Sequence, residues 1–260
     1  MENKKKFIVA VLTLSSFGYG FLSGVYQLPP YSIMKTVKVS YSDALGRNSL
    51  PKVEAPYFEG KAKAIILGNS LTVHAPATDL GWNGFYGMAA SSKKADYVHQ
   101  LLHILGISSE LAYIRNMYPL EVDSSPIFEF KKQLENLFAN SSNADVVVLQ
   151  LGDNVRNRKG STKDLSISMN EIFNSIPKDI HSSVFCVSTY WGKSIVDNVI
   201  RDICEKYNSS FVYIGDIFPR QNLTIDKYEF HGVNIHPKDR EMLMIAERIY
   251  GQIMSKKAGF

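Results

Sequence analysis

The sequence is poor in cysteine and has no large excess of charge of one sign. Only Cys186 and Cys204 occur among 260 residues, too few for a disulfide scaffold or a cysteine-rich structural zinc site. One bridge between them is possible outside the cytoplasm, but two buried free thiols are the expected state. Lys and Arg number 29 against 25 Asp and Glu. This balance gives no basic stripe and does not favour a nucleic-acid partner.

The sequence also has no internal repeat and no low-complexity tract. Hydrophobic residues make up 45% and charged residues 21%, which is typical of globular proteins and not of disordered chains. The length allows one or two domains, and a single α/β domain accounts for it.

The N-terminal segment, residues 1–30, is expected to be a membrane anchor or a signal segment. A lysine cluster at residues 4–6 precedes an uncharged run from Phe7 to Leu28. As a helix this run spans roughly 33 Å, enough to cross a hydrocarbon core of ~30 Å. The lysines favour a cytoplasmic N-terminus, which would place the rest of the chain outside the cytoplasm. A cleaved signal peptide and a buried soluble helix remain as alternatives.

Residues 31–60 are mixed and polar, and they are interpreted as a linker to a domain at residues 61–260. A short strand at Val37–Tyr41 would instead make part of this segment belong to the domain.

From residue 61 onward the pattern predicts strands alternating with helices. The expected strands are Ala64–Leu67, Leu111–Ile114, Asp145–Leu151, Ser183–Ser188 and Phe211–Ile214. The expected helices are Ala89–Leu105, Ile127–Phe138, Leu165–Ile176, Ile195–Tyr207 and Pro237–Met254. Such alternation predicts a mainly parallel sheet covered on both faces, with ligands bound beyond the carboxyl ends of the strands.

Four segments carry candidate chemistry: two directly follow predicted strands, one leads into a predicted helix and one precedes the last predicted helix. They are Gly68–Thr72, Gly81–Ser92, Gln150–Val155 and Gly232–Pro237. In that order, they could supply an exposed serine nucleophile, a glycine whose backbone N–H approaches a ligand closely, an amide that donates to an oxyanion, and a histidine base. Taken singly, each fits a plain structural role as well: a turn, a loop with a serine N-cap, a second turn and a structural histidine.

Together and in this order, the four segments resemble the SGNH hydrolases, the GDSL-like esterase superfamily. Gly68-Asn69-Ser70-Leu71 resembles the first block of that family, with Asn69 where Asp is usual. Gly87 resembles the glycine of the second block, and Asn154 the asparagine of the third. His236-Pro237 resembles the fifth block. The resemblance implies a three-layer α/β/α fold of flavodoxin-like type, with Ser70, Gly87, Asn154 and His236 in the site.

The sequence departs from the family at the catalytic acid. The position three residues before His236, where the family usually has Asp, is Val233. Glu229 and Asp239 are the nearest acids. The site is therefore either a Ser–His dyad oriented by a backbone carbonyl, or it takes a carboxylate from elsewhere in the chain.

The chemistry that the resemblance implies is acyl transfer through a covalent ester on Ser70. His236 would act as general base, and the oxyanion would be bound by the N–H groups of Ser70 and Gly87 and by the Asn154 side chain. No metal or cofactor is required. The expected function is an exported, membrane-anchored serine esterase for a small-molecule or carbohydrate ester, of which a deacetylase of cell-surface sugars is one form.

Two further function classes remain open at this point. One is an O-acyltransferase in which a sugar hydroxyl replaces water, and the other is a non-catalytic binding module on the same fold. A set of aromatic residues beside the candidate segments could stack on sugar rings or could simply pack; these are Trp82, Phe85, Tyr86, Tyr190 and Trp191.

Overall fold

The structure is a computed structural model that describes residues 61–158, 160–218, 228 and 230–259. The predicted anchor at residues 1–30 and the predicted linker at residues 31–60 lie outside these residues. Among the helices of the described part, none is both long enough and apolar enough to cross a membrane.

The described residues are built on a five-stranded parallel sheet with the strand order β2-β1-β3-β4-β5. The strands are β1 (Ala64–Gly68), β2 (Ala112–Asn116), β3 (Val146–Gln150), β4 (Val184–Val187) and β5 (Ser210–Val212). Gly68 pairs with Asn116 on one side and with Gln150 on the other, so β2, β1 and β3 end level with one another. The segments that follow these three strands therefore meet at one edge of the sheet.

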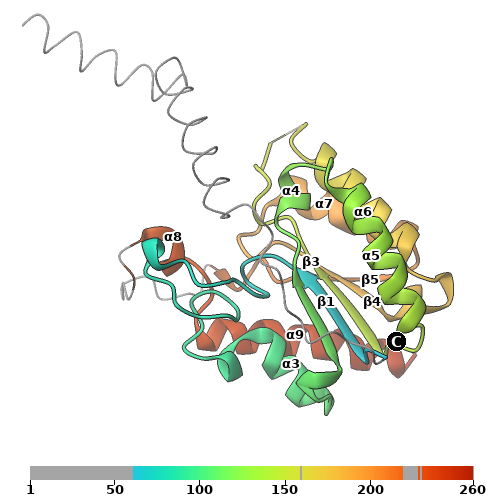
Figure 1. Ribbon diagram of the computed structural model, residues 1–260, viewed down its shortest axis with the longest axis horizontal. Helices are drawn as coiled ribbons and strands as arrows, with labels where there is room; N and C mark the ends of the chain where they lie inside the picture. Colours follow the sequence, from blue (N-terminus) through green and yellow to red (C-terminus); the bar gives the residue numbers. More distant parts are fainter. Residues whose placement is uncertain (1–60, 159, 219–227, 229, 260) are drawn as a thin grey trace, which may run out of the picture. The chain divides into compact units, whose positions relative to one another are not determined.

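Helices cover both faces of the sheet, which confirms the predicted three-layer α/β architecture (Figure 1). On one face lie α3 (Tyr97–Leu105) and α9 (Asp239–Lys257), and on the other lie α5 (Ile127–Asn140), α6 (Lys163–Ser175) and α7 (Ser194–Lys206). Side chains alternate between these two layers along each strand. In β1, for example, Ile66 packs with α3 and α9 whereas Ile65 packs with the other three helices. Burial on both faces explains why the strands are continuous apolar runs.

The helix predicted at Ala89–Leu105 is shorter than expected, because α3 begins only at Tyr97. Residues 89–96 form turns and one short 3-10 segment. The Asp96 side chain accepts a hydrogen bond from the His99 N–H and caps α3 there. The segment after Gly87 is therefore a loop rather than the start of a helix.

The two cysteines form a disulfide between β4 and α7, with their Cα atoms 6.2 Å apart. The expectation of two free thiols is therefore wrong. Cys186 and Cys204 are both fully buried in the same apolar layer, where α7 packs against the sheet, and this packing brings their side chains together.

Candidate active site

Ser70 lies on a tight turn directly after β1. The Asn69 carbonyl accepts hydrogen bonds from the N–H groups of Thr72 and Val73, at 3.0 and 3.1 Å. A Cβ atom on Gly68 would meet the Thr72 side chain, so the turn requires glycine where it leaves the strand. The turn presents Ser70 half-buried at the carboxyl end of the sheet.

His236 faces Ser70 from the segment between the short helix α8 (His231–Asn234) and α9. Its Nε2 atom lies 2.9 Å from Ser70 Oγ, and its Nδ1 atom lies 2.7 Å from the Gly232 carbonyl oxygen. A proton on Nδ1 satisfies that carbonyl and leaves Nε2 as an acceptor for the serine hydroxyl. The sequence separates the two residues by 166 positions, and the fold brings them together.

Burial keeps the His236 imidazole neutral over most of the pH range. It lowers the pKa of His236 to about 4, the Gly232 carbonyl opposes this shift, and the neighbouring His74 adds to it. A neutral imidazole at neutral pH is the form that a general base needs.

The position where the family usually has its acid is filled by an apolar side chain. Val233 is fully buried in an apolar cluster. Asp239 accepts hydrogen bonds from the Ser91 N–H and from Ser91 Oγ, at 2.7 and 2.6 Å, and Glu229 lies outside the described residues. His236 Nδ1 contacts the Gly232 carbonyl, and the identity of any catalytic acid stays a prediction.

Asn154 lies on the loop after β3, the strand next to β1. Its side chain is exposed, and its Nδ2 atom donates one hydrogen bond of 2.6 Å to Glu121 Oε2. An amide nitrogen carries two hydrogens, so one remains for a ligand. This geometry is compatible with the oxyanion role predicted for Asn154, which stays a prediction.

Glu121 is a site residue that the sequence reasoning missed. It lies in α4 (Pro119–Val122), just beyond β2, and is 1% exposed. Burial raises the pKa of Glu121 to about 7, and the charge of Asp153 adds to the shift. The only sequence signal was an isolated acid shortly after the predicted strand at Leu111–Ile114, and a single residue makes no recognisable motif.

Asn69 connects Glu121 to a second buried carboxylate, Asp153. Its Nδ2 atom donates to Glu121 Oε1 at 2.8 Å and to Asp153 Oδ2 at 3.1 Å. Asp153 also accepts from the Gln150 side chain and from the Tyr190 N–H. Burial raises the pKa of Asp153 as well, while these hydrogen bonds oppose the shift. The turn that carries Ser70 is thus hydrogen-bonded, through the Asn69 amide, to the carboxyl groups of both Glu121 and Asp153.

Gly87 is placed beside the nucleophile turn. The N–H of the next residue, Met88, donates to the Ser70 carbonyl at 2.8 Å. The Gly87 N–H itself donates to Asp96 Oδ2 at 3.1 Å. A role in binding an oxyanion stays a prediction, and it requires that this N–H be shared with Asp96 or released from it.

We expect Gly87→Ala to destabilise the protein by about 1–3 kcal/mol, because the added methyl group would overpack a filled site. A Cβ atom there would lie 2.5 Å from the Leu71 carbonyl oxygen. Gly251 in α9 is the matched control, because a Cβ atom there meets nothing within 4 Å. Gly251→Ala should stabilise the helix by about 0.5–1 kcal/mol. Chemical denaturation measures both, and equal effects would contradict this account of Gly87.

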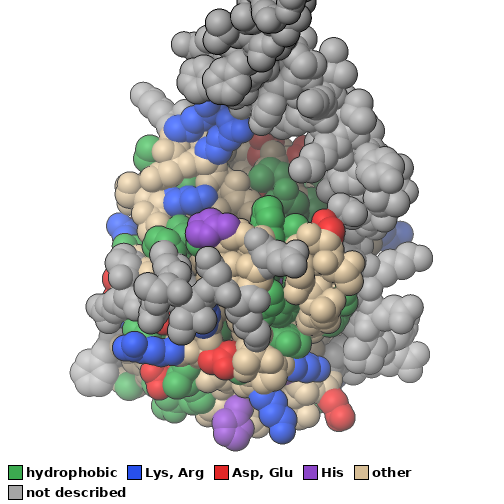
Figure 2. All heavy atoms as spheres, turned by 90° about the vertical axis from the view of Figure 1, so that its left-hand side faces the viewer, with side chains coloured by type: hydrophobic (Ala, Val, Ile, Leu, Met, Phe, Trp, Pro, Cys, Tyr) green, Lys and Arg blue, Asp and Glu red, His purple; other side chains and the backbone are tan. Residues whose placement is uncertain are grey.

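The aromatic residues near the site divide into two groups. Trp82 and Tyr190 are 2% and 0% exposed, so packing is their role. Phe85 is 47% exposed, and Trp191 is half-buried with its ring centroid 5.4 Å from that of His236. Phe85, Trp191 and the half-buried Tyr86 therefore have faces that a substrate could touch. Figure 2 shows the molecule from the side on which α8 lies in Figure 1; basic, apolar, acidic and histidine side chains are interspersed on it.

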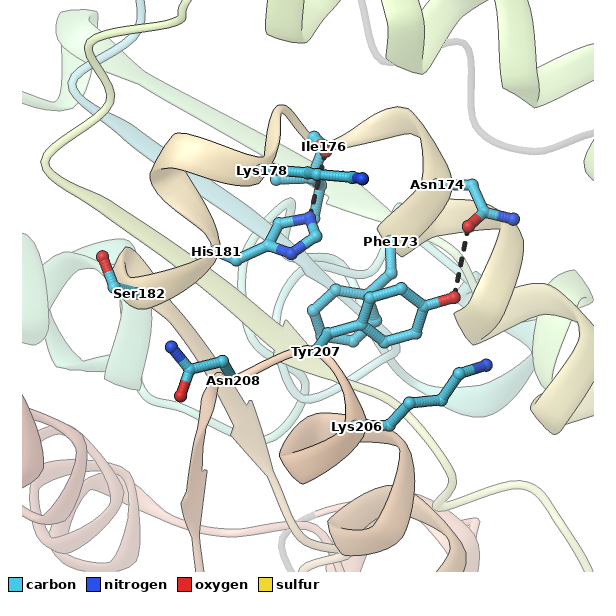
Figure 3. Close-up of a pocket in the computed structure, with 9 residues that line it drawn as sticks. All are labelled: Phe173, Asn174, Ile176, Lys178, His181, Ser182, Lys206, Tyr207 and Asn208. Carbon is cyan, nitrogen blue, oxygen red and sulfur yellow. Dashed lines mark hydrogen bonds between the residues drawn. The ribbon is translucent and has the colours of Figure 1, made fainter.

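A separate hollow of about 530 Å³ lies at the opposite end of the sheet (Figure 3). Its residues lie at the end of α6 and in the segments that lead into β4 and β5, so it opens near the amino ends of these strands and away from Ser70. The rings of Phe173 and Tyr207 stack there with their centroids 4.4 Å apart. The Tyr207 hydroxyl donates a hydrogen bond to Asn174 Oδ1, and Lys206 Nζ lies over the Tyr207 ring. These side chains at the ends of α6 and α7 therefore contact one another along the wall of the hollow.

No protein-family model matches the chain, and no curated protein matches it. Solved structures similar to it include a protein from Bacteroides ovatus described as a GDSL-like lipase. That protein is 13% identical, the match covers 75% of this chain and 99% of the other, and the TM-score is 0.46. An acetylxylan esterase from Geobacillus stearothermophilus is 15% identical over 75% of this chain and 95% of its own, with a TM-score of 0.40. A catalytic mutant of that esterase is 13% identical over the same shares, with a TM-score of 0.44.

Proposed function

We propose that this protein is a serine hydrolase that cleaves carboxylic esters through an acyl-enzyme. The observation that carries the proposal is the 2.9 Å contact of Ser70 Oγ with the Nε2 atom of a neutral His236, whose Nδ1 atom faces the Gly232 carbonyl. A nucleophile, a base and a group that orients the base are the parts that acyl transfer needs. They meet at the carboxyl end of a parallel sheet, where α/β folds bind ligands.

In this mechanism His236 Nε2 takes the hydroxyl proton as Ser70 Oγ attacks the ester carbonyl carbon. The carbonyl oxygen becomes an oxyanion, for which the second Nδ2 hydrogen of Asn154 and the Ser70 N–H are the donors. The intermediate collapses, and His236 returns the proton to the departing alkoxide. Water then loses a proton to His236 and attacks the acyl group, which leaves as the free acid and restores Ser70 Oγ–H.

Hydrolysis of aryl acetates by the purified full-length chain tests this function, with and without a sugar acceptor. Release of acetate and phenol in equal amounts, unaffected by the sugar, is the expected result. Transfer of acetyl to the sugar would make the protein an O-acyltransferase. No release of phenol under either condition would leave the binding-module interpretation. An acetylated carbohydrate is the natural ester that we propose, because the half-buried ring of Trp191 lies beside His236 and could stack on a sugar.

We further propose that the domain is exported and anchored by the segment Phe7–Leu28. The lysines before this apolar run favour a cytoplasmic N-terminus, and the Cys186–Cys204 disulfide suits an oxidising compartment. Protease added to intact cells or spheroplasts should then degrade the domain, while a cytoplasmic marker protein survives. Protection of the domain until the membrane is lysed would contradict this topology.

A further inference from the structure

The carboxylate of Glu121 is the centre of the hydrogen bonds behind the candidate site. Its Oε1 atom accepts from the Gly152 N–H and from Asn69 Nδ2, both at 2.8 Å. Its Oε2 atom accepts from the Asn154 N–H at 3.0 Å and from Asn154 Nδ2 at 2.6 Å. Glu121 itself follows β2, whereas its donors follow β1 and β3. One buried side chain therefore joins the segments that leave three neighbouring strands.

Two of these contacts restrain Asn154, one through its backbone and one through its side chain. The bond from Nδ2 to Glu121 limits rotation of the amide and fixes the plane in which the second hydrogen lies. An oxyanion donor is effective only when it is held in place before the charge develops. The acceptor that holds Asn154 is therefore part of the machinery, although Glu121 is too deeply buried to touch a substrate.

The same carboxylate explains why residue 69 carries an amide. The Asn69 Nδ2 group donates to both Glu121 and Asp153, while its Oδ1 atom accepts from the Leu71 N–H at 3.0 Å. An aspartate at this position would keep the contact with Leu71. It would also place a third carboxylate between those of Glu121 and Asp153, and it could donate no hydrogen bond to either of them.

We propose that Glu121 is a positioning residue: it holds Asn154 as an oxyanion donor, and together with Asp153 it requires an amide at residue 69. The first half of this inference rests on the proposed esterase function, because a donor matters only if an oxyanion forms. The second half concerns the fold alone and can be tested without activity.

Titration of Glu121 gives this role a pH dependence. When the carboxyl group of Glu121 is protonated, one of its oxygens becomes a hydroxyl group and can no longer accept two hydrogen bonds. The four contacts are therefore complete only when Glu121 is ionised. Burial places its pKa at about 7. The charge that acts on it is that of Asp153, which raises its pKa. Lys193 Nζ binds the backbone carbonyl of Asp153, and Asp164 of α6 binds Ser124, three residues after Glu121. Because Glu121 and Asp153 interact, the observed inflection belongs to the pair.

Glu121→Gln tests the positioning role by kinetics. We expect kcat for an aryl acetate to fall about 10- to 100-fold with little change in KM, because Asn154 is displaced while the substrate surface is intact. In the wild type kcat should rise through about pH 7, and this inflection should be missing in Glu121→Gln. The matched control is Glu129→Gln on the exposed surface of α5, which should retain both the wild-type kcat and the inflection. An active Glu121→Gln with unchanged kcat and unchanged pH profile would overturn the inference.

A charge swap tests the amide requirement without an assay of activity. Asn69→Asp should lower Tm by about 10 °C, because it places a third carboxylate between those of Glu121 and Asp153 and removes the hydrogens that both accept. Asn69→Asp combined with Glu121→Gln restores the number of carboxylates to two and should recover a substantial part of that loss. Additive losses in the double variant would overturn the second half of the inference. Failure of the esterase proposal itself would look different: the wild type would hydrolyse no ester, and the Tm pattern would still hold.

Discussion

Replacing Ser70 or His236 by alanine should lower kcat for an aryl acetate by about 10⁴- to 10⁶-fold, and the double variant should be no less active than either single variant. The two side chains act in one step, since the hydroxyl attacks only as the imidazole removes its proton. They lie 2.9 Å apart, as this step requires. Once one of them is lost, the other has no remaining function, so the losses do not add.

Controls for this pair are available on the same chain. Ser125→Ala and His103→Ala remove an exposed serine and an exposed histidine outside the four candidate segments, and both should keep the wild-type rate. The pH profile gives a second check. Because the pKa of His236 is lowered to about 4, protonation of the base should add a second inflection near that pH, below the one assigned to Glu121 near pH 7 and well below the ordinary 6.5 of histidine. Strictly additive losses, or full activity of Ser70→Ala, would contradict the assignment of the nucleophile.

Asn154→Ala should lower kcat by roughly 10²- to 10³-fold with little change in KM, the signature of a contact made mainly in the transition state. The side chain is exposed beside the nucleophile turn, and one of its two Nδ2 hydrogens is not used by Glu121. The loss should exceed that of Glu121→Gln, which displaces the donor but leaves it present.

The Asn154 variant needs a check on stability, because removing the amide also takes a hydrogen bond from a buried carboxylate. Asn140→Ala, at the exposed end of α5, is the control for the loss of an asparagine. A variant that folds with the wild-type Tm and keeps the wild-type kcat would show that Asn154 serves only the turn.

Much of the architecture could be predicted because the strands are buried on both faces. A central strand such as β3 has no solvent side, and its run of valines and leucine stands out in the sequence. Short turn motifs after such strands are also visible and indicate Ser70 and Asn154, whereas His236 is indicated by its place on a loop before the last predicted helix. The structure places Ser70 and His236 in contact and leaves the role of Asn154 to experiment.

The remaining features depend on contacts between distant segments. The start of α3 was misplaced because Ala89 and Ala90 favour a helix locally, whereas the Met88 N–H is held by the Ser70 carbonyl and helps to keep this stretch in a loop. Glu121 is an isolated acid in the sequence, and its role depends on hydrogen bonds from residues on the loops after β1 and β3. The disulfide depends in the same way on the packing of α7 against β4.

Labelling with a serine-directed phosphonate, followed by mass spectrometry of the peptides, tests the central claim most directly. The reagent should add one covalent phosphonyl group to the wild type at Ser70 and none to Ser70→Ala. Labelling should be strongly slowed in His236→Ala, because the hydroxyl then lacks its base. Labelling at another residue, or equal labelling of the wild type and Ser70→Ala, would contradict the account.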